Sequence, residues 1–402
     1  MRRLLAYRDA RLLLAGETLS AFGDWAMWFV MAIWMKSLTG SSAQAGLVFF
    51  VLALGNLAGP LGGLLVDRLP RRRLMIATDC VLGVSVLSLL FLHSRGDAWL
   101  IYLVALLYGV GGTVFFPARA ALLRLMLPEE LLADANGALS SVRQGLRIVA
   151  PLAGAGLYAA FGQGRPVAIL DAATFAGSAL LLARIRVVEE KPEPSEQHFL
   201  GEVTAGIDHV WRTVPLRQMV FGTTLALLVV GFTETLIFTV IAHLGRQPSF
   251  FGVLGTLQGV GSIVGGVTAA SLVRRVGELR TVGIGLSLFG ACGTLLAVPS
   301  LAVVLLGFIV AGVGIVWAIV GFNTALQTRT PLAIQGRVSA ASEISLTVAQ
   351  TTSIATGAAL STIVDYRILL VAMSAVVIAS SVYLVTRREP PIRAEVAPLT
   401  ID

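Results

Sequence analysis

The stretch GLLVDRLPRRR, residues 63–73, lies between two apolar segments that are each long enough to cross a lipid bilayer. One acid and four arginines at such a place predict a short, water-exposed turn between two membrane spans. Cytoplasmic loops of membrane proteins carry an excess of Lys and Arg, so we expect this turn on the cytoplasmic side. The stretch therefore predicts a multi-pass membrane protein.

The composition of the whole chain supports the same class. Of the 402 residues, 56% are hydrophobic and only 13% are charged, whereas soluble domains carry about 25% charged residues. The net charge of +7 is spread over short connections and forms no basic face, so we expect no nucleic-acid partner. Cys80 and Cys292 both lie inside apolar segments, which disfavours a disulfide framework or a metal cluster.

Apolar segments of about 20 residues, the length of a membrane-spanning helix, predict twelve spans. They cover residues 12–35, 43–66, 74–92, 99–118, 137–160, 166–184, 217–242, 250–273, 281–298, 301–326, 338–363 and 368–386. A long polar stretch separates the sixth span from the seventh. We therefore predict an all-α membrane protein whose parts are an N-terminal six-helix half at 1–185, a cytoplasmic linker at 186–216, a C-terminal six-helix half at 217–387 and a cytoplasmic tail at 388–402.

The two predicted halves align with each other when the sequence is shifted by 206 positions. The shift superimposes Gly46 on Gly252, Gly55 on Gly261, Gly59 on Gly265 and Arg68 on Arg274. Glycine is abundant, at 42 residues, so a chance alignment is the alternative interpretation. Four matches in one register, with a basic loop at the same place, favour a true repeat. Paired repeats are typical of secondary transporters.

The positive charges indicate how the predicted spans are oriented. All but seven of the 30 Lys and Arg residues fall on one side of the predicted spans. Five lie on the other side and two inside the fifth span, and these seven are Lys36, Arg95, Arg165, Arg246, Arg367, Arg143 and Arg147. By the positive-inside rule, both termini are cytoplasmic.

Several motifs resemble one known family. The loop 63–73 resembles the signature between helices 2 and 3 of the major facilitator superfamily, with Pro70 in place of the second glycine. SAFGD at 20–24, FPARAAL at 116–122 and LPEE at 127–130 are similar to its exporter branch, which contains macrolide-efflux and enterobactin-exporter-type proteins. The resemblance implies a twelve-helix fold with alternating access in the bacterial inner membrane.

Acidic residues inside predicted spans are the first candidates for ion coupling, because a charge at the bilayer centre costs about 2.5–3.5 kcal/mol on insertion scales. Glu17, Ser20, Asp24 and Trp28 are spaced as one polar stripe on a helix. Span 1 faces the central cavity in the implied fold, so Asp24 is the first candidate to carry a proton or bind a cation. Glu234 is the second and faces it across the repeat interface. The alternative for Asp24 is a structural acid capped by a neighbouring group.

A second set of charges predicts a gate on the cytoplasmic side. Arg143 and Arg147 are four residues apart and share a helix face, and Glu343 has a similar depth in the eleventh span. An Arg–Glu pair between the halves would close that side. Alternatively, Arg147 holds an anionic group, or both arginines snorkel to lipid headgroups. The family resemblance adds Asp67 and Arg68 to the gate, with Asp67 bracing the end of the eleventh span.

Polar and aromatic residues at span centres are the candidates for a substrate cavity. They are Glu17, Ser20, Trp28, Phe116, Trp317, Asn323 and Gln327. Ordinary packing is the alternative for the aromatic ones. Asp79 and Asp171 lie in spans that are peripheral in the implied fold, so we expect structural roles for them.

These observations predict a proton-coupled exporter of amphipathic small molecules that needs no cofactor and works as a monomer in the lipid bilayer. An enzyme is disfavoured, because the four His residues lie in loops or at span ends and share no helix face. Sodium is the alternative driving ion. Alternative functions are the export of a siderophore or another metabolite and, less favoured, ferroportin-like export of a divalent metal. Gly23-Asp24 is similar to the ferroportin pattern, but Trp28 stands where a metal-binding His is expected.

Overall fold

The structure of the chain, a computed structural model, describes residues 4–187, 189, 199–331 and 334–387. Some side chains inside helices, that of Asp67 among them, are outside the description, as is the predicted tail 388–402. Within the described ranges the fold is all-α and contains no strand. The structure thus confirms the predicted fold class.

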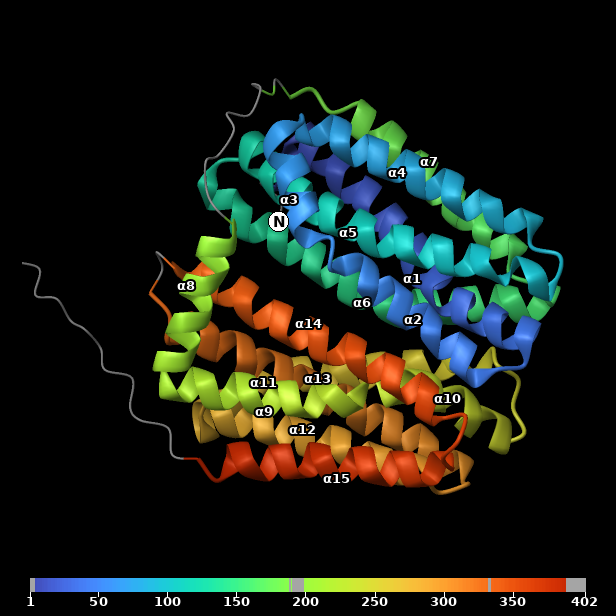
Figure 1. The fold of residues 1–402 in the computed structure, drawn as a ribbon. Coiled ribbons are helices and arrows are strands. Elements are labelled where there is room, and N and C mark those ends of the chain that lie inside the picture. The colour runs from blue at the N-terminus through green and yellow to red at the C-terminus, as the bar shows by residue number, and fades with distance from the viewer. Residues whose placement is uncertain (1–3, 188, 190–198, 332–333, 388–402) are drawn as a thin grey trace, which may run out of the picture.

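The helices form two bundles joined by a short connecting helix (Figure 1). The first bundle consists of α1 (Arg8–Thr39), α2 (Ser42–Asn56), α3 (Gly59–Arg68), α4 (Arg71–Leu87), α5 (Trp99–Met126), α6 (Glu129–Phe161) and α7 (Arg165–Ala183). The second consists of α9 (Val214–Val230), α10 (Phe232–His243), α11 (Phe250–Val276), α12 (Glu278–Leu296), α13 (Leu301–Thr328), α14 (Gln335–Leu360) and α15 (Tyr366–Val385). The connecting helix is α8 (Phe199–Arg212). The boundaries of the predicted halves remain predictions.

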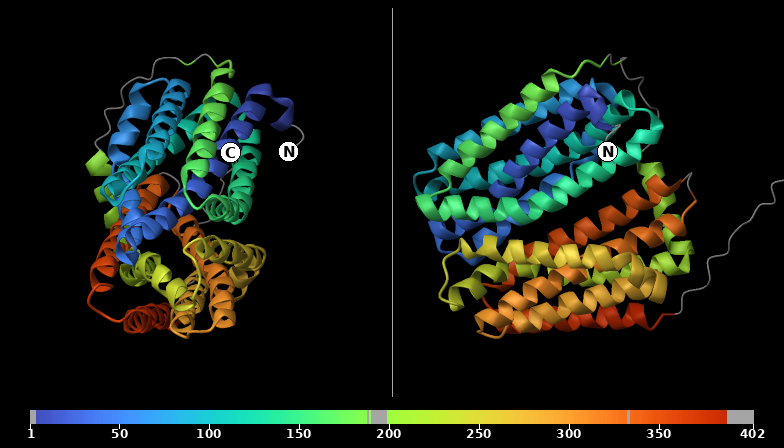
Figure 2. Two further views of the ribbon diagram at one scale, coloured as in Figure 1. Left: turned by 90° about the vertical axis from the view of Figure 1, so that its right-hand side faces the viewer. Right: turned by 180° about the vertical axis from the view of Figure 1, so that it is seen from behind.

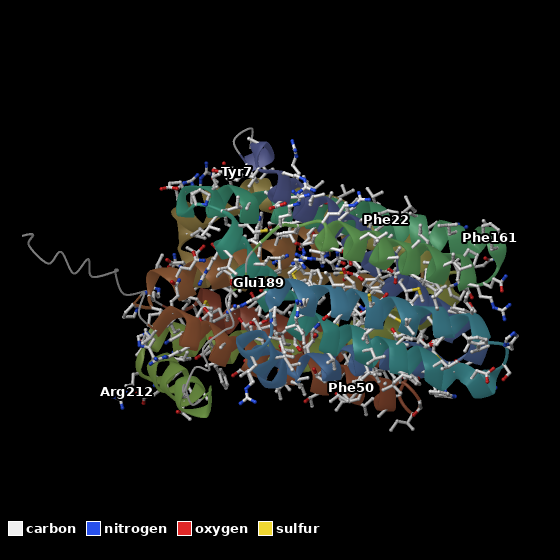
Figure 3. The ribbon with its side chains drawn as sticks, turned by 90° about the horizontal axis from the view of Figure 1, so that it is seen from above. Tyr7, Phe22, Phe50, Phe161, Glu189 and Arg212 are labelled. Carbon is white, nitrogen blue, oxygen red and sulfur yellow. The ribbon has the colours of Figure 1, made fainter. Side chains whose placement is uncertain are left out.

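The two ends of the molecule differ, and we name them for what they carry. Tyr7 and Arg212 lie near one end and Phe161 near the other (Figure 3). We call the first the linker end, because α8 lies across it, and the second the far end. Figure 2 shows from behind how α8 lies beside the linker end of the second bundle.

Eight segments of the described structure are long and apolar enough to cross a membrane, so the chain is a multi-pass membrane protein. The predicted number of twelve spans remains a prediction. The predicted spans outside these eight segments coincide with α1, the pair α2–α3, α6 and α14. All four carry acids or arginines selected above, since a helix that faces a polar interior tolerates charges that a lipid-facing helix does not.

Repeated glycines position the helices within each bundle. A Cβ on Gly55 would collide with Leu106 and Gly109 of α5, and one on Gly261 would collide with Ile309 of α13. Both glycines therefore allow two backbones to approach closely. Equivalent glycines thus pack on a similarly placed helix in each bundle. Gly59, in contrast, has open space around it.

The bundles meet at the far end. Gly46 of α2 packs on Thr235 of α10, and Gly252 of α11 packs on Pro151 and Ala155 of α6, with no room for a side chain at either glycine. At the linker end, α3 packs on α5 of its own bundle. The close contacts between bundles therefore concentrate at the far end.

Candidate transport cavity

A cavity of about 780 Å³ lies between the two bundles. Its wall is mostly aromatic and aliphatic, with Trp25, Trp28, Phe29 and Phe49 from the first bundle and Phe251, Phe289, Phe308 and Phe322 from the second. Pockets for drug-sized ligands have volumes of about 300–1,000 Å³ and are lined in this way. The cavity thus has the size and surface that an amphipathic small molecule requires.

Aromatic rings close the cavity toward the far end. Phe251, at the start of α11, contacts Phe29 with ring centroids 4.7 Å apart, Phe238 at 5.1 Å and Phe49 at 6.1 Å. Trp28 contacts Phe49 at 6.0 Å. Rings from both bundles therefore interlock, and edge-to-face or offset pairs of this kind add about 0.5–1.5 kcal/mol each beyond their buried area.

Three charged side chains line the cavity wall. Arg147 comes from α6 of the first bundle, whereas Glu234 of α10 and Glu343 of α14 come from the second. The Arg147 guanidinium carbon lies 5.7 Å from the centre of the Trp25 ring, within the range of a cation–π interaction. Arg147 and Glu234 lie within electrostatic range of each other.

Five predicted site residues thus reach the cavity, namely Arg147, Glu234, Glu343, Trp28 and Asn323. Sequence spacing placed them at the right depth, and each is turned toward the space between the bundles. Polar wall residues that we did not predict include Asn56, Gln258 and Gln350. The shift of 206 positions superimposes Gln350 on Gln144, but it places Asn56 on Ser262 and Gln258 on Leu52, so it gives no consistent signal for these wall residues.

Other predicted cavity residues do not line the wall. The Trp317 indole nitrogen donates a hydrogen bond of 2.9 Å to the hydroxyl of Thr268, so Trp317 joins α13 to α11 within the second bundle. Gln327 is exposed, and Ser20 is buried away from the cavity. Phe116 is 44% exposed, and its ring lies 4.2 Å from the Arg143 guanidinium carbon. The structure places these four residues outside the wall of this cavity, because helical spacing specifies a shared face but not which neighbour that face meets.

Glu17 also lies off the cavity, in a buried cluster of charges inside the first bundle. It is 4% exposed and pairs with Arg119 of α5 and with Nε of Arg143, 3.3 Å away on α6. Arg143 therefore pairs with Glu17, and the predicted pair between Arg143 and Glu343 is not formed. We missed Arg119 as a partner because we ended the fourth span at residue 118, whereas α5 continues to Met126.

Asp24 lies in the first bundle as well, close to two other acids. Its electrostatic neighbours include Asp171 of α7 and Asp79 of α4, and its Oδ1 is enclosed without a hydrogen-bond partner among the described residues. Tyr108 donates a hydrogen bond to Asp171. Asp24 and Glu234 therefore do not face each other across the cavity. Gly23 makes this arrangement possible, since a Cβ there would collide with Asp171.

The predicted loop 63–73 consists of the end of α3, a two-residue turn at Leu69 and Pro70, and the start of α4. The side chain of Asp67 is outside the description, and Arg68 is exposed at the end of α3. The carboxylate of Glu189, from the chain after α7, accepts hydrogen bonds from the backbone N–H groups of Arg71 and Arg72, at 2.5 and 2.9 Å. The start of α4 is thereby joined to the beginning of the linker. The gate role of Asp67 and Arg68 stays a prediction.

Two bundles of membrane helices around a cavity are typical of transporters. The sequence comparison identifies the family. Residues 13–242 and 219–399 both match the family model described as Major Facilitator Superfamily. The chain belongs to the major facilitator superfamily. It is therefore a multi-pass membrane transporter by family, as its motifs predicted.

Relatives within the superfamily are similar over most of the chain. An uncharacterized MFS-type transporter, YfiS of Bacillus subtilis, is 25% identical over 87% of this chain and 85% of its own length. The putative bacilysin exporter BacE of Bacillus amyloliquefaciens is 26% identical over 94% of both chains. Macrolide efflux protein A of Enterococcus faecalis is 28% identical, but over only 37% of this chain and 47% of its own length.

Solved structures of the superfamily share the fold. A bacterial homologue of the iron transporter ferroportin in its inward-facing state has a TM-score of 0.73 at 17% identity, covering 94% of this chain and 99% of that one. The POT family transporter PepTSo has a TM-score of 0.76 at 12% identity, over 94% and 97% of the two chains. At these identities the likeness concerns the fold alone. Among the described residues, no group of three or more His, Cys, Asp or Glu side chains is arranged to hold a metal ion.

Proposed function

We propose that this transporter exports amphipathic small molecules across the bacterial inner membrane by alternating access, in exchange for protons. The observation that carries the proposal is the cavity of about 780 Å³ between the two bundles, with aromatic walls and a few charges. Relatives named as a macrolide efflux protein and a putative bacilysin exporter support export over uptake.

The linker end faces the cytoplasm in this proposal. The excess of Lys and Arg on one side of the predicted spans supports that orientation through the positive-inside rule. Since the bundles contact each other closely at the far end and the aromatic rings interlock there, the structure corresponds to a state that receives substrate from the cytoplasm. Rocking of the bundles would then open the far end.

Glu234 is the coupling residue that we propose first, because it lies on the cavity wall where substrate and proton can compete for it. Asp24, which the sequence favoured, lies instead beside Asp79 and Asp171 within the first bundle. Three neighbouring acids inside a membrane cannot all be ionised at low cost. We therefore propose Asp24 as a second proton carrier that acts away from the substrate.

The test is uptake of a fluorescent cationic dye into inverted membrane vesicles with an acidic lumen. We expect dye uptake by the wild type that collapses when the gradient is dissipated, and loss of uptake in Glu234→Gln. Asp24→Asn should uncouple uptake from the gradient, while the exposed control Glu130→Gln should behave as the wild type. Uptake that does not depend on the proton gradient would overturn proton coupling. Uptake that depends on a sodium gradient would identify sodium as the driving ion.

A dedicated exporter of one metabolite is the second candidate. It is favoured by the relative named putative bacilysin exporter, which matches this chain over 94% of both lengths. Siderophore export belongs to the same alternative. Ferroportin-like metal export is weaker, because the wall position that would bind metal is Trp28. Absence of dye transport together with export of a single metabolite would select this candidate.

A further inference from the structure

The charges on the cavity wall are divided between the two bundles by sign. Arg147 is the one positive side chain among the wall residues and belongs to the first bundle. Glu234 and Glu343 are the negative ones and belong to the second. Among the described residues, neither carboxylate forms an ion pair or hydrogen bond with Arg147, although Glu234 is close enough to interact with it electrostatically. The wall thus presents charges of both signs that no ion pair or hydrogen bond among the described residues satisfies.

Arg147 forms no ion pair among the described residues, unlike two other arginines inside the first bundle. Arg119 and Arg143, the latter one helical turn before Arg147, both form ion pairs with Glu17. Among the described residues, Arg147 has the Trp25 ring beside its guanidinium and Glu234 within electrostatic range, but no ion pair or hydrogen bond. A half-buried guanidinium without a carboxylate or carbonyl partner is costly at membrane depth, so an anionic group of a ligand is its natural counterpart.

The carboxylates of Glu234 and Glu343 likewise lack an ion pair among the described residues, and a cationic group of a ligand could form one with them. A purely cationic ligand would leave Arg147 without an anionic partner and a purely anionic ligand would leave the glutamates without a cationic one, so we expect either to bind more weakly than a ligand with both charges. A ligand that carries both charges satisfies the whole set. Charge-assisted hydrogen bonds of this kind are shorter and stronger than those between neutral groups.

We propose that the cavity binds amphipathic zwitterions, whose anionic group lies at Arg147 and whose cationic group lies at Glu234 and Glu343. The inference rests on the proposed export function and specifies its substrate class. The apolar body of such a molecule would lie against Trp25, Trp28 and Phe29, which line the cavity wall, with Trp25 beside Arg147. The cavity volume of about 780 Å³ leaves room for a bulky apolar body beside the two charged groups.

A zwitterion in this position would join the two bundles. Its anionic end would be held by α6 and its cationic end by α10 and α14, so binding would favour the approach of the bundles at the linker end. A ligand of single charge could bind to only one bundle in this way. Proton binding by Glu234 would remove one partner of the cationic group and release the ligand, which connects the substrate class to the proposed exchange with protons.

The experiment compares three ligands of one body by calorimetric titration of the purified full-length protein in detergent. The probes are the dipeptide phenylalanyl-phenylalanine, its N-acetyl derivative and its C-terminal amide. Capping removes one charge at a time and leaves the apolar body nearly unchanged. We expect the zwitterion to bind about tenfold or more tightly than either capped form. Equal affinities of the three probes would overturn the proposal.

Variants then assign each charge to its residue. Arg147→Gln should remove the preference for the zwitterion over the amide, and Glu234→Gln with Glu343→Gln should remove the preference over the N-acetyl form. The exposed controls Arg11→Gln and Glu130→Gln should keep both preferences. A preference that survives Arg147→Gln would overturn the assignment. If a variant fails to fold, the wild-type comparison of the three probes still decides the proposal.

Failure of this inference is distinguishable from failure of the export function. Gradient-driven dye uptake with equal binding of the three probes would overturn the zwitterion site alone. Selective binding of the zwitterion without gradient-driven transport of any probe would leave the site in place and count against proton-coupled export. Vesicle uptake and titration are separate measurements, so each outcome has one interpretation.

Discussion

Glu17 shows at the scale of single residues how this bundle accommodates charge. Its carboxylate is 4% exposed and serves two arginines, Arg119 and Arg143, from different helices. The three side chains together fasten α1 to α5 and α6. Removing one member of a buried set leaves the others as uncompensated charges, and that loss costs more than the net stability that the set contributes.

We expect Glu17→Gln to destabilise the protein by about 3–5 kcal/mol, because it leaves two cations facing a neutral amide. The measurement is thermal unfolding in detergent, followed by intrinsic tryptophan fluorescence. Glu130→Gln, at an exposed position of α6, is the matched control and should leave the midpoint unchanged. A midpoint for Glu17→Gln equal to that of the wild type would show that water or lipid headgroups reach the two arginines.

At the scale of one element, α4 depends on a residue from another part of the chain. Its first turn follows Pro70, which supplies no side-chain cap. The first N–H groups of a helix lack partners within the helix. Here the Glu189 carboxylate accepts the hydrogen bonds that the N–H groups of Arg71 and Arg72 donate. The Arg72 guanidinium also donates a hydrogen bond of 2.7 Å to the carbonyl of Ile185. The connection between α3 and α4 is therefore stabilised by Ile185 and Glu189, which follow α7.

We expect Glu189→Ala to destabilise the start of α4 by about 0.5–2 kcal/mol, the usual cost of losing a helix cap. The effect should be local. Hydrogen–deuterium exchange of peptides covering residues 69–75 should become faster, with little change in peptides of α12, the corresponding helix of the other bundle. Glu189→Asp keeps the charge and should recover part of the protection. Unchanged exchange at residues 69–75 would contradict the cap.

At the scale of the whole molecule, close contacts at the far end hold the bundles together. Gly46 lies against Thr235 and Gly252 against Ala155, and neither glycine has room for a side chain. Packed surfaces of this kind adopt discrete arrangements. A bulky residue at either glycine would therefore shift the populations of the far-end-closed and far-end-open states and would not simply distort the closed one. The far-end contacts therefore set the balance between the two states that alternating access requires.

Gly46→Val should open the far end in a substantial fraction of molecules, since the valine side chain overlaps Thr235. Spin labels at Gln163→Cys and Gln247→Cys, on far-end loops of different bundles, report this as an added longer distance in double electron–electron resonance. The same substitution at Gly59, which has open space around it, should leave the distance distribution as it is in the label-only protein. A single unchanged distance in Gly46→Val would show that the contact does not control the state.

The sequence by itself determined the class of this protein, the course of its helices and the turn at residues 63–73. These properties depend on the length of apolar segments, which must match the bilayer thickness, and on the local positive charge, which sets their orientation. It also placed Arg147, Glu234 and Glu343 at the depth where the cavity lies.

Only the tertiary structure decided which groups meet. It paired Arg143 with Glu17 in place of Glu343, turned Trp317 toward Thr268 and put Asp24 beside Asp171 instead of on the cavity wall. The physical reason is that helical periodicity states which residues share a face, while the rotation of each helix and its neighbour in the bundle come from packing against the other helices.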